Sequence, residues 1–299
     1  MNETADPLVS VVIPTYNHAS YLGRALQSVL DQTYTNWEAI VIDNHSTDKT
    51  DEVKASFADP RIIYLKIHNN GVIAASRNLG IRTAKGQWIA FLDSDDWWTV
   101  DKLQVCFDCI NDKVDLVYHD LKIIRVPPSL FKRKHIKSRQ VKKPVLKDLL
   151  LKGNTIATTS VVVRKSLLEQ ICGMDESVKM IAAEDYNTWF RIAQLTDNFL
   201  HIPKSLGHYL FHAGGVSRKN IEELLHTVCK EFMYLLEPQE KVVYEAMACY
   251  IIALDNFYSG RTSSARKKLP YSIRFGSLPI KAKSLLLYII VSVKFWKII

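Results

Sequence analysis

Apolar runs alternate with helically spaced apolar positions through the first hundred residues of the chain. Residues 8–15 are rich in β-branched side chains and end beside a proline, which is typical of a buried parallel strand. Residues 19–31 instead place their apolar side chains on one face of a helix. The same alternation predicts further strands at 38–42, 62–67 and 88–92, and further helices at 50–57 and 72–84.

This alternation predicts βαβ units and therefore an α/β fold built around a mostly parallel central sheet with flanking helices. In open sheets of this kind, ligands bind beyond the carboxyl ends of the strands. The loops that follow Thr15, Ile42 and Leu92 are therefore the first places in which we expect functional side chains.

Beyond Asp96 the alternation weakens. The expected elements are helices at 101–110 and 184–194, short strands at 116–118 and 161–163, and edge strands at 199–202 and 207–211. From Arg218 onward the pattern is helical, at 221–236 and 242–258. We therefore expect a domain of residues 1–218, followed by a helical C-terminal appendage of residues 219–299.

Basic residues are concentrated in two segments of this 299-residue chain. The formal net charge is +8, but residues 122–147 contain ten Lys or Arg and no acid, and residues 261–299 contain nine more, again with no acid. The rest of the chain is net acidic. This distribution argues against a general nucleic-acid-binding protein, so we expect no nucleic acid as a partner.

Cysteine usage and the apolar segments predict the compartment. Five cysteines are an odd number and are scattered, which favours a reduced, cytoplasmic protein. The beginning of the sequence is polar and acidic, so no secretory signal is expected. The most apolar stretch, residues 285–293, is far shorter than the roughly 20 residues that cross a bilayer.

The loop after the fourth expected strand carries three carboxylates, in the order Asp93-Ser94-Asp95-Asp96. Carboxylates placed together need a cation, and Mg²⁺ in proteins binds one or two carboxylates plus substrate phosphates. The alternative is an acidic turn in which Asp96 caps the next helix. The position at a central strand end favours a divalent metal ion.

Two other loops point to a nucleotide. Asp43 follows the second strand, where its carboxylate can accept hydrogen bonds from a base or a ribose, although an Asx turn is the alternative. Residues 14–18 contain no glycine, so the loop cannot form the Gly-rich turn of dinucleotide-binding folds. Phosphate must then be neutralised by metal and side chains. Arg77 is the natural cation, and the alternative is an ordinary surface arginine.

Glu184 and Asp185 begin an expected helix. Acids in the first helical turn interact favourably with the helix dipole, which can be a purely structural role. The same dipole keeps a carboxylate ionised, as a general base near neutral pH requires. The residues alone leave both readings open.

Together these segments resemble family 2 glycosyltransferases from about residue 9 to residue 217. The matching motifs are residues 11–17 (VVIPTYN), 32–34 (QTY), 43–48 (DNHSTD), 77–80 (RNLG) and 91–96 (FLDSDD), with Glu184, Asp185 and His212. The resemblance implies a GT-A fold with a Rossmann-like sheet, a nucleotide-diphosphate sugar donor, Mn²⁺ or Mg²⁺, and inversion at the anomeric carbon.

The resemblance also implies a role for individual residues. Those expected to contact the nucleotide or the donor are Pro14, Tyr16, Asp43, Arg77, Asp93 and Ser94. Those expected to hold the metal are Asp95, Asp93 and His212. Asp185 is expected to be the base that takes the proton of the acceptor hydroxyl, and Glu184 to orient it or the acceptor. Trp98 and Asp96 are candidates for contact with the sugar or the acceptor.

The chain departs from the family pattern at three places. Asn44 and His45 stand where the family has Asp and Gly, which weakens the expected nucleotide contact at Asn44. Cys172 replaces the first glycine of a pair near the acceptor side. Leu210 stands before the histidine motif where a basic residue is common.

The C-terminal segment mixes lysines with apolar residues in a way that suits an anionic bilayer surface. Residues 269–299 carry Lys281, Lys283, Lys294 and Lys297 around an apolar run. Docking onto the chain's own catalytic domain and a dimer contact are the alternatives. The basic segment 122–147 can bind acidic lipid, diphosphate or RNA, or be a solvated loop. We therefore expect a protein peripheral to the inner face of the cell membrane.

The resemblance, together with these observations, implies a metal-dependent inverting hexosyltransferase. By family analogy, it moves a hexose from a UDP donor to a saccharide or polyprenyl-diphosphate-linked saccharide, and forms a β-linkage in bacterial O-antigen, capsule or lipooligosaccharide synthesis. One alternative is a nucleotidyltransferase, which also places acids at strand ends. Another is a non-catalytic module that binds a sugar nucleotide or RNA through residues 122–147.

Overall fold

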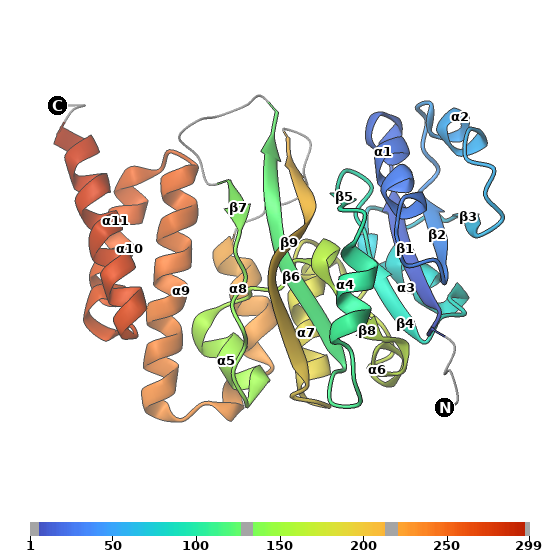
Figure 1. The fold of residues 1–299 in the computed structure, drawn as a ribbon. Coiled ribbons are helices and arrows are strands. Elements are labelled where there is room, and N and C mark those ends of the chain that lie inside the picture. The colour runs from blue at the N-terminus through green and yellow to red at the C-terminus, as the bar shows by residue number, and fades with distance from the viewer. Residues whose placement is uncertain (1–5, 127–133, 213–220, 297–299) are drawn as a thin grey trace. The chain divides into compact units, whose positions relative to one another are not determined.

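The computed structural model describes residues 6–126, 134–212 and 221–296. The chain divides into two compact units (Figure 1). The first comprises Met1–Val141 and Thr155–Val216, and the second comprises Lys142–Asn154 and Ser217–Ile299. The boundary expected near Arg218 falls outside the described residues.

One mixed sheet organises the first unit. Its strands are β1 (Val9–Thr15), β2 (Trp37–Asp43), β3 (Ile62–Lys66), β4 (Trp88–Phe91), β5 (Trp97–Trp98), β6 (Leu116–Arg125), β7 (His135–Ile136), β8 (Val162–Arg164) and β9 (Phe199–Phe211). Their order is β3-β2-β1-β4-β8-β6-β9-β5, and β7 pairs with β6. The strands β1 to β4 pair in parallel, as do β6 and β9, whereas β8, β5 and β7 run antiparallel to their neighbours. The expected mostly parallel sheet is confirmed.

Helices cover both faces of this sheet, which explains why all seven residues of β1 are buried. The helices of the first unit are α1 (Ala19–Leu30), α2 (Thr50–Ala55), α3 (Ile73–Thr83), α4 (Lys102–Cys109), α6 (Lys165–Gln170) and α7 (Glu184–Ala193). The side chains of Val11 and Ile13 share a core cluster with α1 and α4. On the opposite face, α3 approaches so closely that a Cβ on Gly80 would lie 2.5 Å from a methyl group of Val12.

The parallel strands bring their carboxyl ends to one edge of the sheet. Residues 16–18, 44–48, 92–96 and 212 directly follow β1, β2, β4 and β9. Segments that lie far apart in the sequence therefore meet at this edge, where ligands of such sheets bind.

Two expectations differ from the structure in this unit. The two edge strands expected at 199–202 and 207–211 are one strand, β9, which pairs in parallel with β6 across a register shift. The basic segment 122–147 is not a single loop, because it contains the end of β6, all of β7 and the start of a helix. Its residues 127–133 lie outside the described part of the chain.

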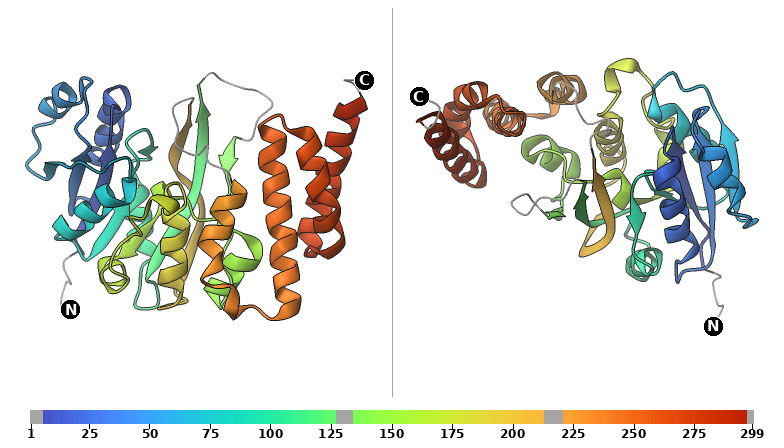
Figure 2. Two further views of the ribbon diagram at one scale, coloured as in Figure 1. Left: turned by 180° about the vertical axis from the view of Figure 1, so that it is seen from behind. Right: turned by 90° about the horizontal axis from the view of Figure 1, so that it is seen from above.

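The second unit is helical, as expected for the C-terminal region. Its helices are α5 (Val145–Lys152), α8 (Ile221–Lys230), α9 (Pro238–Tyr258), α10 (Thr262–Phe275) and α11 (Leu278–Trp296). Successive helices from α9 to α11 reverse direction and lie side by side in each view (Figure 2). Their shared core contains Ala253, Ala265, Leu269, Leu287 and Val291.

The helix α5 belongs to this second unit, although its sequence position lies within residues 1–218. Lys147 forms an ion pair of 2.6 Å with Glu240 of α9. A Cβ on Gly153, directly after α5, would lie 3.1 Å from Ile251 of α9, so the two segments pack closely. This packing explains the assignment of residues 142–154 to the helical unit.

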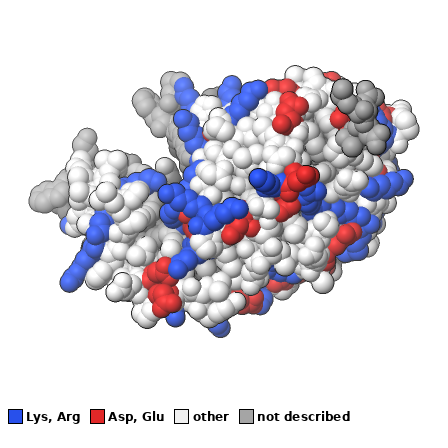
Figure 3. Space-filling view, turned by 60° about the horizontal axis from the view of Figure 1, so that its bottom comes forward, with Lys and Arg blue, Asp and Glu red and all other residues white. Residues whose placement is uncertain are grey.

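No helix among the described residues is long and apolar enough to span a bilayer. On the face shown in Figure 3, basic side chains are interspersed with acidic ones rather than forming one unbroken basic surface.

Candidate active site

The loops after β1 and β2 are joined by hydrogen bonds at the carboxyl edge of the sheet. The backbone N–H of Asn17 donates to Ser46 Oγ over 2.8 Å, and that of Thr47 donates to Asn17 Oδ1 over 2.8 Å. Asn17 holds a left-handed backbone with φ of 51°, a conformation that Asn tolerates better than most residues. These hydrogen bonds between polar motif residues hold the two loops together at the edge of the sheet.

Asp43 is the last residue of β2, beside these two joined loops. Its Oδ1 accepts hydrogen bonds from the backbone N–H and the hydroxyl of Ser46. Its Oδ2 is buried and accepts no hydrogen bond from any described residue.

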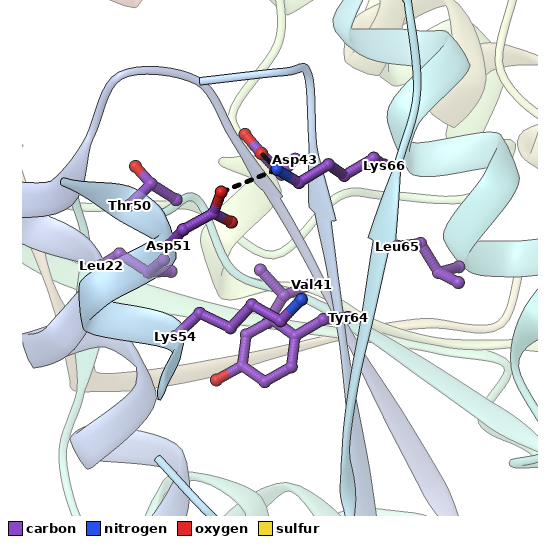
Figure 4. Close-up of a pocket in the computed structure, with 9 residues that line it drawn as sticks. All are labelled: Leu22, Val41, Asp43, Thr50, Asp51, Lys54, Tyr64, Leu65 and Lys66. Carbon is purple, nitrogen blue, oxygen red and sulfur yellow. Dashed lines mark hydrogen bonds and ion pairs between the residues drawn. The ribbon is translucent and has the colours of Figure 1, made fainter. Parts of the chain in front are cut away.

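A small pocket beside Asp43 is lined by β2, β3 and α2 (Figure 4). Lys66 of β3 reaches into it and forms an ion pair of 2.9 Å with Asp51, while its Nζ lies 3.8 Å from Asp43. The ammonium therefore lowers the net negative charge around the Asp43 carboxylate without forming a hydrogen bond to it.

The two expected nucleotide contacts in the first loop differ in exposure. The side chain of Tyr16 is 54% exposed, so its ring is open to a ligand. Pro14 is buried within β1 and supports the loop from below. Asn44 uses its Oδ1 to accept the backbone N–H of Asn69, so its amide joins two loops of the protein.

A cluster of potential metal ligands lies at the end of β4. Asp95 Oδ2 is 2.9 Å from His212 Nε2, and His18 approaches both. One ligand atom from each of the three residues lies within 4.8 Å of the others. Carboxylate and imidazole are ligands that divalent transition ions accept, so the donor set fits such an ion. Ser94 Oγ lies 2.9 Å from His18 Nδ1.

Arg77 joins the acidic motif after β4 to the acidic motif at the start of α7. Its Nη2 donates to Asp93 Oδ1 over 2.7 Å, and its Nη1 donates to Glu184 Oε1 over 2.8 Å. Arg77 is 3% exposed, and its guanidinium is occupied by the two carboxylates rather than open to a phosphate. Asp93 lies outside the cluster of His18, Asp95 and His212.

Asp185 follows Glu184 in the first turn of α7. Its Oδ2 accepts a hydrogen bond of 3.0 Å from the hydroxyl of Thr158. Burial, and then the neighbouring Glu184 carboxylate, raise the pKa of Asp185 to about 6, although Arg77 lowers it. A carboxylate with such a pKa is ionised near neutral pH and still basic enough to accept a proton.

Trp98 and Asp96 are not placed to contact a sugar or an acceptor. Trp98 is 3% exposed, belongs to the core cluster, and donates its indole N–H to the carbonyl of Thr159. Asp96 is 1% exposed, and its Oδ1 accepts the backbone N–H of Leu210. Burial and the nearby Asp93 and Asp95 raise its pKa. Asp96 instead joins the loop after β4 to β9, and Trp98 joins β5 to the turn at Thr159.

The RNLG motif has a structural explanation. Asn78 accepts the backbone N–H of Met174 and donates to the carbonyl of the same residue, and so holds the segment after α6. Gly80 allows the close approach of α3 to β1 and β2. Cys172 has φ of 57° and Gly173 has φ of 77°, which explains why a glycine pair suits this turn.

Sequence reasoning missed three residues that the fold brings into the site: His18, Thr158 and Thr159. His18 directly follows the motif after β1, so the strand-end argument could have found it. The two threonines lie in the 3₁₀ turn Thr158–Ser160, and Thr159 Oγ1 accepts the backbone N–H of Asp93. They carry no local motif, so only the fold reveals their partners.

Known proteins are similar to this chain in sequence and in fold. The family model described as "Glycosyl transferase family 2" matches residues 10–172. Escherichia coli WfgD, named as a UDP-Glc:α-D-GlcNAc-diphosphoundecaprenol β-1,3-glucosyltransferase, is 32% identical over 194 residues, or 64% of this chain and 72% of WfgD. Escherichia coli WfaP carries the same functional name and is 31% identical over 228 residues, or 73% of this chain and 83% of WfaP.

Among solved structures, the S. aureus TarS fragment 1–349 in complex with UDP-GlcNAc is similar in fold. The TM-score is 0.63 with 18% sequence identity, and the match covers 97% of this chain and 91% of that one. At this level of identity the similarity shows the fold.

Proposed function

This chain belongs to glycosyltransferase family 2, and from that premise we propose that it transfers a hexose from a UDP-hexose to a hydroxyl of a lipid-linked saccharide. The reaction inverts the anomeric carbon, so an α-linked donor gives a β-linked product. The names of WfgD and WfaP, which describe UDP-glucose, a diphosphoundecaprenol acceptor and a β-linkage, support the donor and acceptor classes. We place the activity in bacterial surface-polysaccharide synthesis.

The observation that carries the proposal is the bridge through Arg77. It connects Asp93, in the acidic loop after β4, with Glu184, the neighbour of Asp185. Because the guanidinium is buried and bonded at both ends, the donor-side and acceptor-side carboxylates are held in one rigid assembly. Such an assembly suits a reaction in which the donor and the acceptor must align.

On the donor side, Tyr16 offers an exposed ring for stacking of the base, and Asp43 offers an oxygen that accepts no hydrogen bond from the described residues for its N–H. Asp95 and His212 would hold Mn²⁺ or Mg²⁺. The ion would supply charge neutralisation on the departing diphosphate. Asp93 contributes through Arg77, and Ser94 through its contact with His18.

On the acceptor side, Asp185 removes the proton of the attacking hydroxyl. The hydroxyl oxygen forms the new bond to the anomeric carbon as the bond to the diphosphate oxygen breaks. Thr158 fixes one oxygen of Asp185 by a hydrogen bond, and Glu184 raises the basicity of the carboxylate by its charge. The displacement occurs in one step and uses no covalent enzyme intermediate.

The helix α11 supports a location at an anionic membrane surface. Leu285, Leu286, Ile289, Ile290 and Val293 are exposed along one side, whereas Leu287 and Val291 pack into the core of the helical unit. At about 100° per residue, Lys281 and Lys283 fall on opposite margins of the exposed apolar stripe. An apolar stripe with lysines on both margins suits the interface of an anionic bilayer, where a lipid-linked acceptor is found.

A transfer assay tests the proposal. The protein is incubated with UDP-glucose, Mn²⁺ and a synthetic GlcNAc-diphosphate lipid, with Asp185→Asn as the matched inactive variant. We expect release of UDP and a β-linked disaccharide lipid, identified by the anomeric coupling in NMR. Release of glucose 1-phosphate in place of UDP would instead indicate a nucleotidyltransferase, and an α-linked product would contradict inversion.

A further inference from the structure

A second imidazole stands beside the Asp95–His212 pair. His18 ends the loop after β1, at the N-terminus of α1, and therefore comes from a different strand end than either Asp95 or His212. Its ligand nitrogen lies within 4.8 Å of the carboxylate oxygen of Asp95 and the ring nitrogen of His212. All three side chains are partly exposed, so an ion can reach them.

We propose that His18 is a direct ligand of the divalent ion, so that the site consists of two imidazoles and one carboxylate and selects Mn²⁺ over Mg²⁺. The inference deepens the proposed function and rests on it, since the ion is the one that accompanies the nucleotide donor. It also assigns Asp93 to Arg77, because the 2.7 Å ion pair already engages the Asp93 carboxylate.

The separations fit coordination of a single ion. Two ligand atoms at about 2.1 Å from an ion and at right angles to each other are about 3 Å apart. Asp95 Oδ2 and His212 Nε2 are separated by 2.9 Å. The ligand atoms of all three residues lie within 4.8 Å of one another, and opposite ligands of one ion at the same bond length are roughly 4.2 Å apart. A small movement of His18 therefore completes the site.

Neighbouring side chains hold His18 in this orientation. Ser94 Oγ lies 2.9 Å from its Nδ1, and when Nδ1 donates its proton there, Nε2 carries the lone pair that binds a metal. The ring of Tyr21 meets His18 edge-on, with centroids 5.4 Å apart, and lies 5.1 Å from His212. Ser94 is therefore a positioning residue for the ion site.

The ligand set determines which ion is preferred. Both ions favour oxygen ligands, but Mg²⁺ retains several waters and binds nitrogen poorly, whereas Mn²⁺, as a first-row transition ion, accepts imidazole more readily. Removing one of two imidazoles should therefore weaken Mn²⁺ more than Mg²⁺. A site with carboxylates alone would show no such difference.

The test measures Mn²⁺ binding by electron paramagnetic resonance, with UDP present and absent, in the full chain. The variants are His18→Ala and His18→Asn, because Asn can begin helix α1 but supplies no imidazole nitrogen. His226→Ala removes an exposed histidine of α8 and is the matched control. Circular dichroism melting verifies that each variant is folded.

We expect both His18 variants to lose at least tenfold in Mn²⁺ affinity and to lose less in Mg²⁺ affinity, while His226→Ala stays native. Pulsed measurements should detect two ¹⁴N-coupled imidazoles on Mn²⁺ in the native protein and one in His18→Asn. Native affinity and two coupled imidazoles in His18→Asn would overturn the inference but leave the proposed function standing. If the native protein binds neither UDP nor Mn²⁺, the inference and the proposed function are both overturned.

Discussion

Asp185 combines burial, a neighbouring carboxylate and a hydrogen bond from Thr158, and its pKa is raised to about 6. For a general base, this pKa means that the active, ionised form disappears as the pH falls through 6. For the stability of the fold the sign is opposite: a carboxyl whose folded pKa lies above its ordinary value destabilises the fold as the pH rises between the two values. Function and stability therefore make opposite demands on Asp185.

The variant Asp185→Asn should separate these two demands. We expect transfer to fall roughly 100- to 10,000-fold, because the base is lost. UDP binding should be unchanged, and the melting temperature at pH 7 should be equal or higher because no ionised carboxylate is buried. In the native protein, kcat/KM should decrease on the acid side with a midpoint near pH 6. A variant that keeps native turnover would contradict the assignment of the base.

Cys172 carries a strained backbone at a position where the family has glycine. Its φ is 57°, which costs a side-chain-bearing residue roughly 1 kcal/mol. Cys172→Gly should raise the free energy of unfolding by about 0.5–1 kcal/mol, since Gly adopts this conformation freely. Cys172→Ala keeps the Cβ and is the control that should show no gain in urea unfolding. Equal stability of both variants would show that the strain is relieved elsewhere.

At the scale of elements, the strands of the first unit were predictable because a buried parallel strand is apolar along its whole length, as β1 is. The strand β9 was predicted as two pieces because Pro203 and Lys204 interrupt its apolar pattern, and only its pairing with β6 makes it continuous. Trp98 illustrates the same limit within the site. An aromatic residue beside a metal motif can face a ligand or the core, and in the structure Trp98 packs in the core.

The helix α4 buries a lysine at its first position. Lys102 is fully buried, its Nζ has no hydrogen-bond partner among the described residues, and it lies 3.6 Å from the ring centre of Trp98. Burial lowers its pKa to about 8. Because the unfolded chain then binds more protons between pH 8 and pH 10.5, stability should rise with pH over this interval.

Lys102→Met should remove the cost of burying this ammonium. We expect the free energy of unfolding at pH 7 to increase by about 1–2 kcal/mol, and the rise between pH 8 and 10.5 to diminish. Urea unfolding at several pH values measures both quantities. A loss of stability in Lys102→Met would indicate that contact with Trp98 outweighs the desolvation of the charge.

The exposed stripe of α11 makes a prediction about membranes. Leu286→Glu and Ile289→Glu should each reduce binding to vesicles that contain anionic lipid, because a carboxylate in the stripe opposes both apolar burial and surface charge. Val178→Glu introduces the same charge at a residue that is 70% exposed in the first unit, and should leave vesicle binding native. Co-sedimentation measures the bound fraction. Equal loss in all three variants would assign the effect to net charge.

At the scale of the whole molecule, the catalytic arrangement depends on topology. Motifs after β1, β2, β4 and β9 meet because these strands run in the same direction and end at one edge. Their positions were predictable from the pattern of strands and from the family resemblance. The partners of Asp185 and Asp93 were not, since Thr158 lies 27 residues from Asp185 and Thr159 lies 66 residues from Asp93 in sequence. Side chains without a motif are identified only by the folded structure.

The most direct test of a metal-dependent nucleotide-sugar site is calorimetric titration of UDP, GDP and TDP, with and without Mn²⁺, into the native protein and Asp95→Ala. We expect UDP to bind selectively, to bind more tightly with Mn²⁺, and to lose that metal-dependent gain in Asp95→Ala. Absence of binding for all three nucleotides in both conditions would contradict the donor site. Metal-dependent UDP binding that Asp95→Ala leaves intact would contradict the role assigned to Asp95.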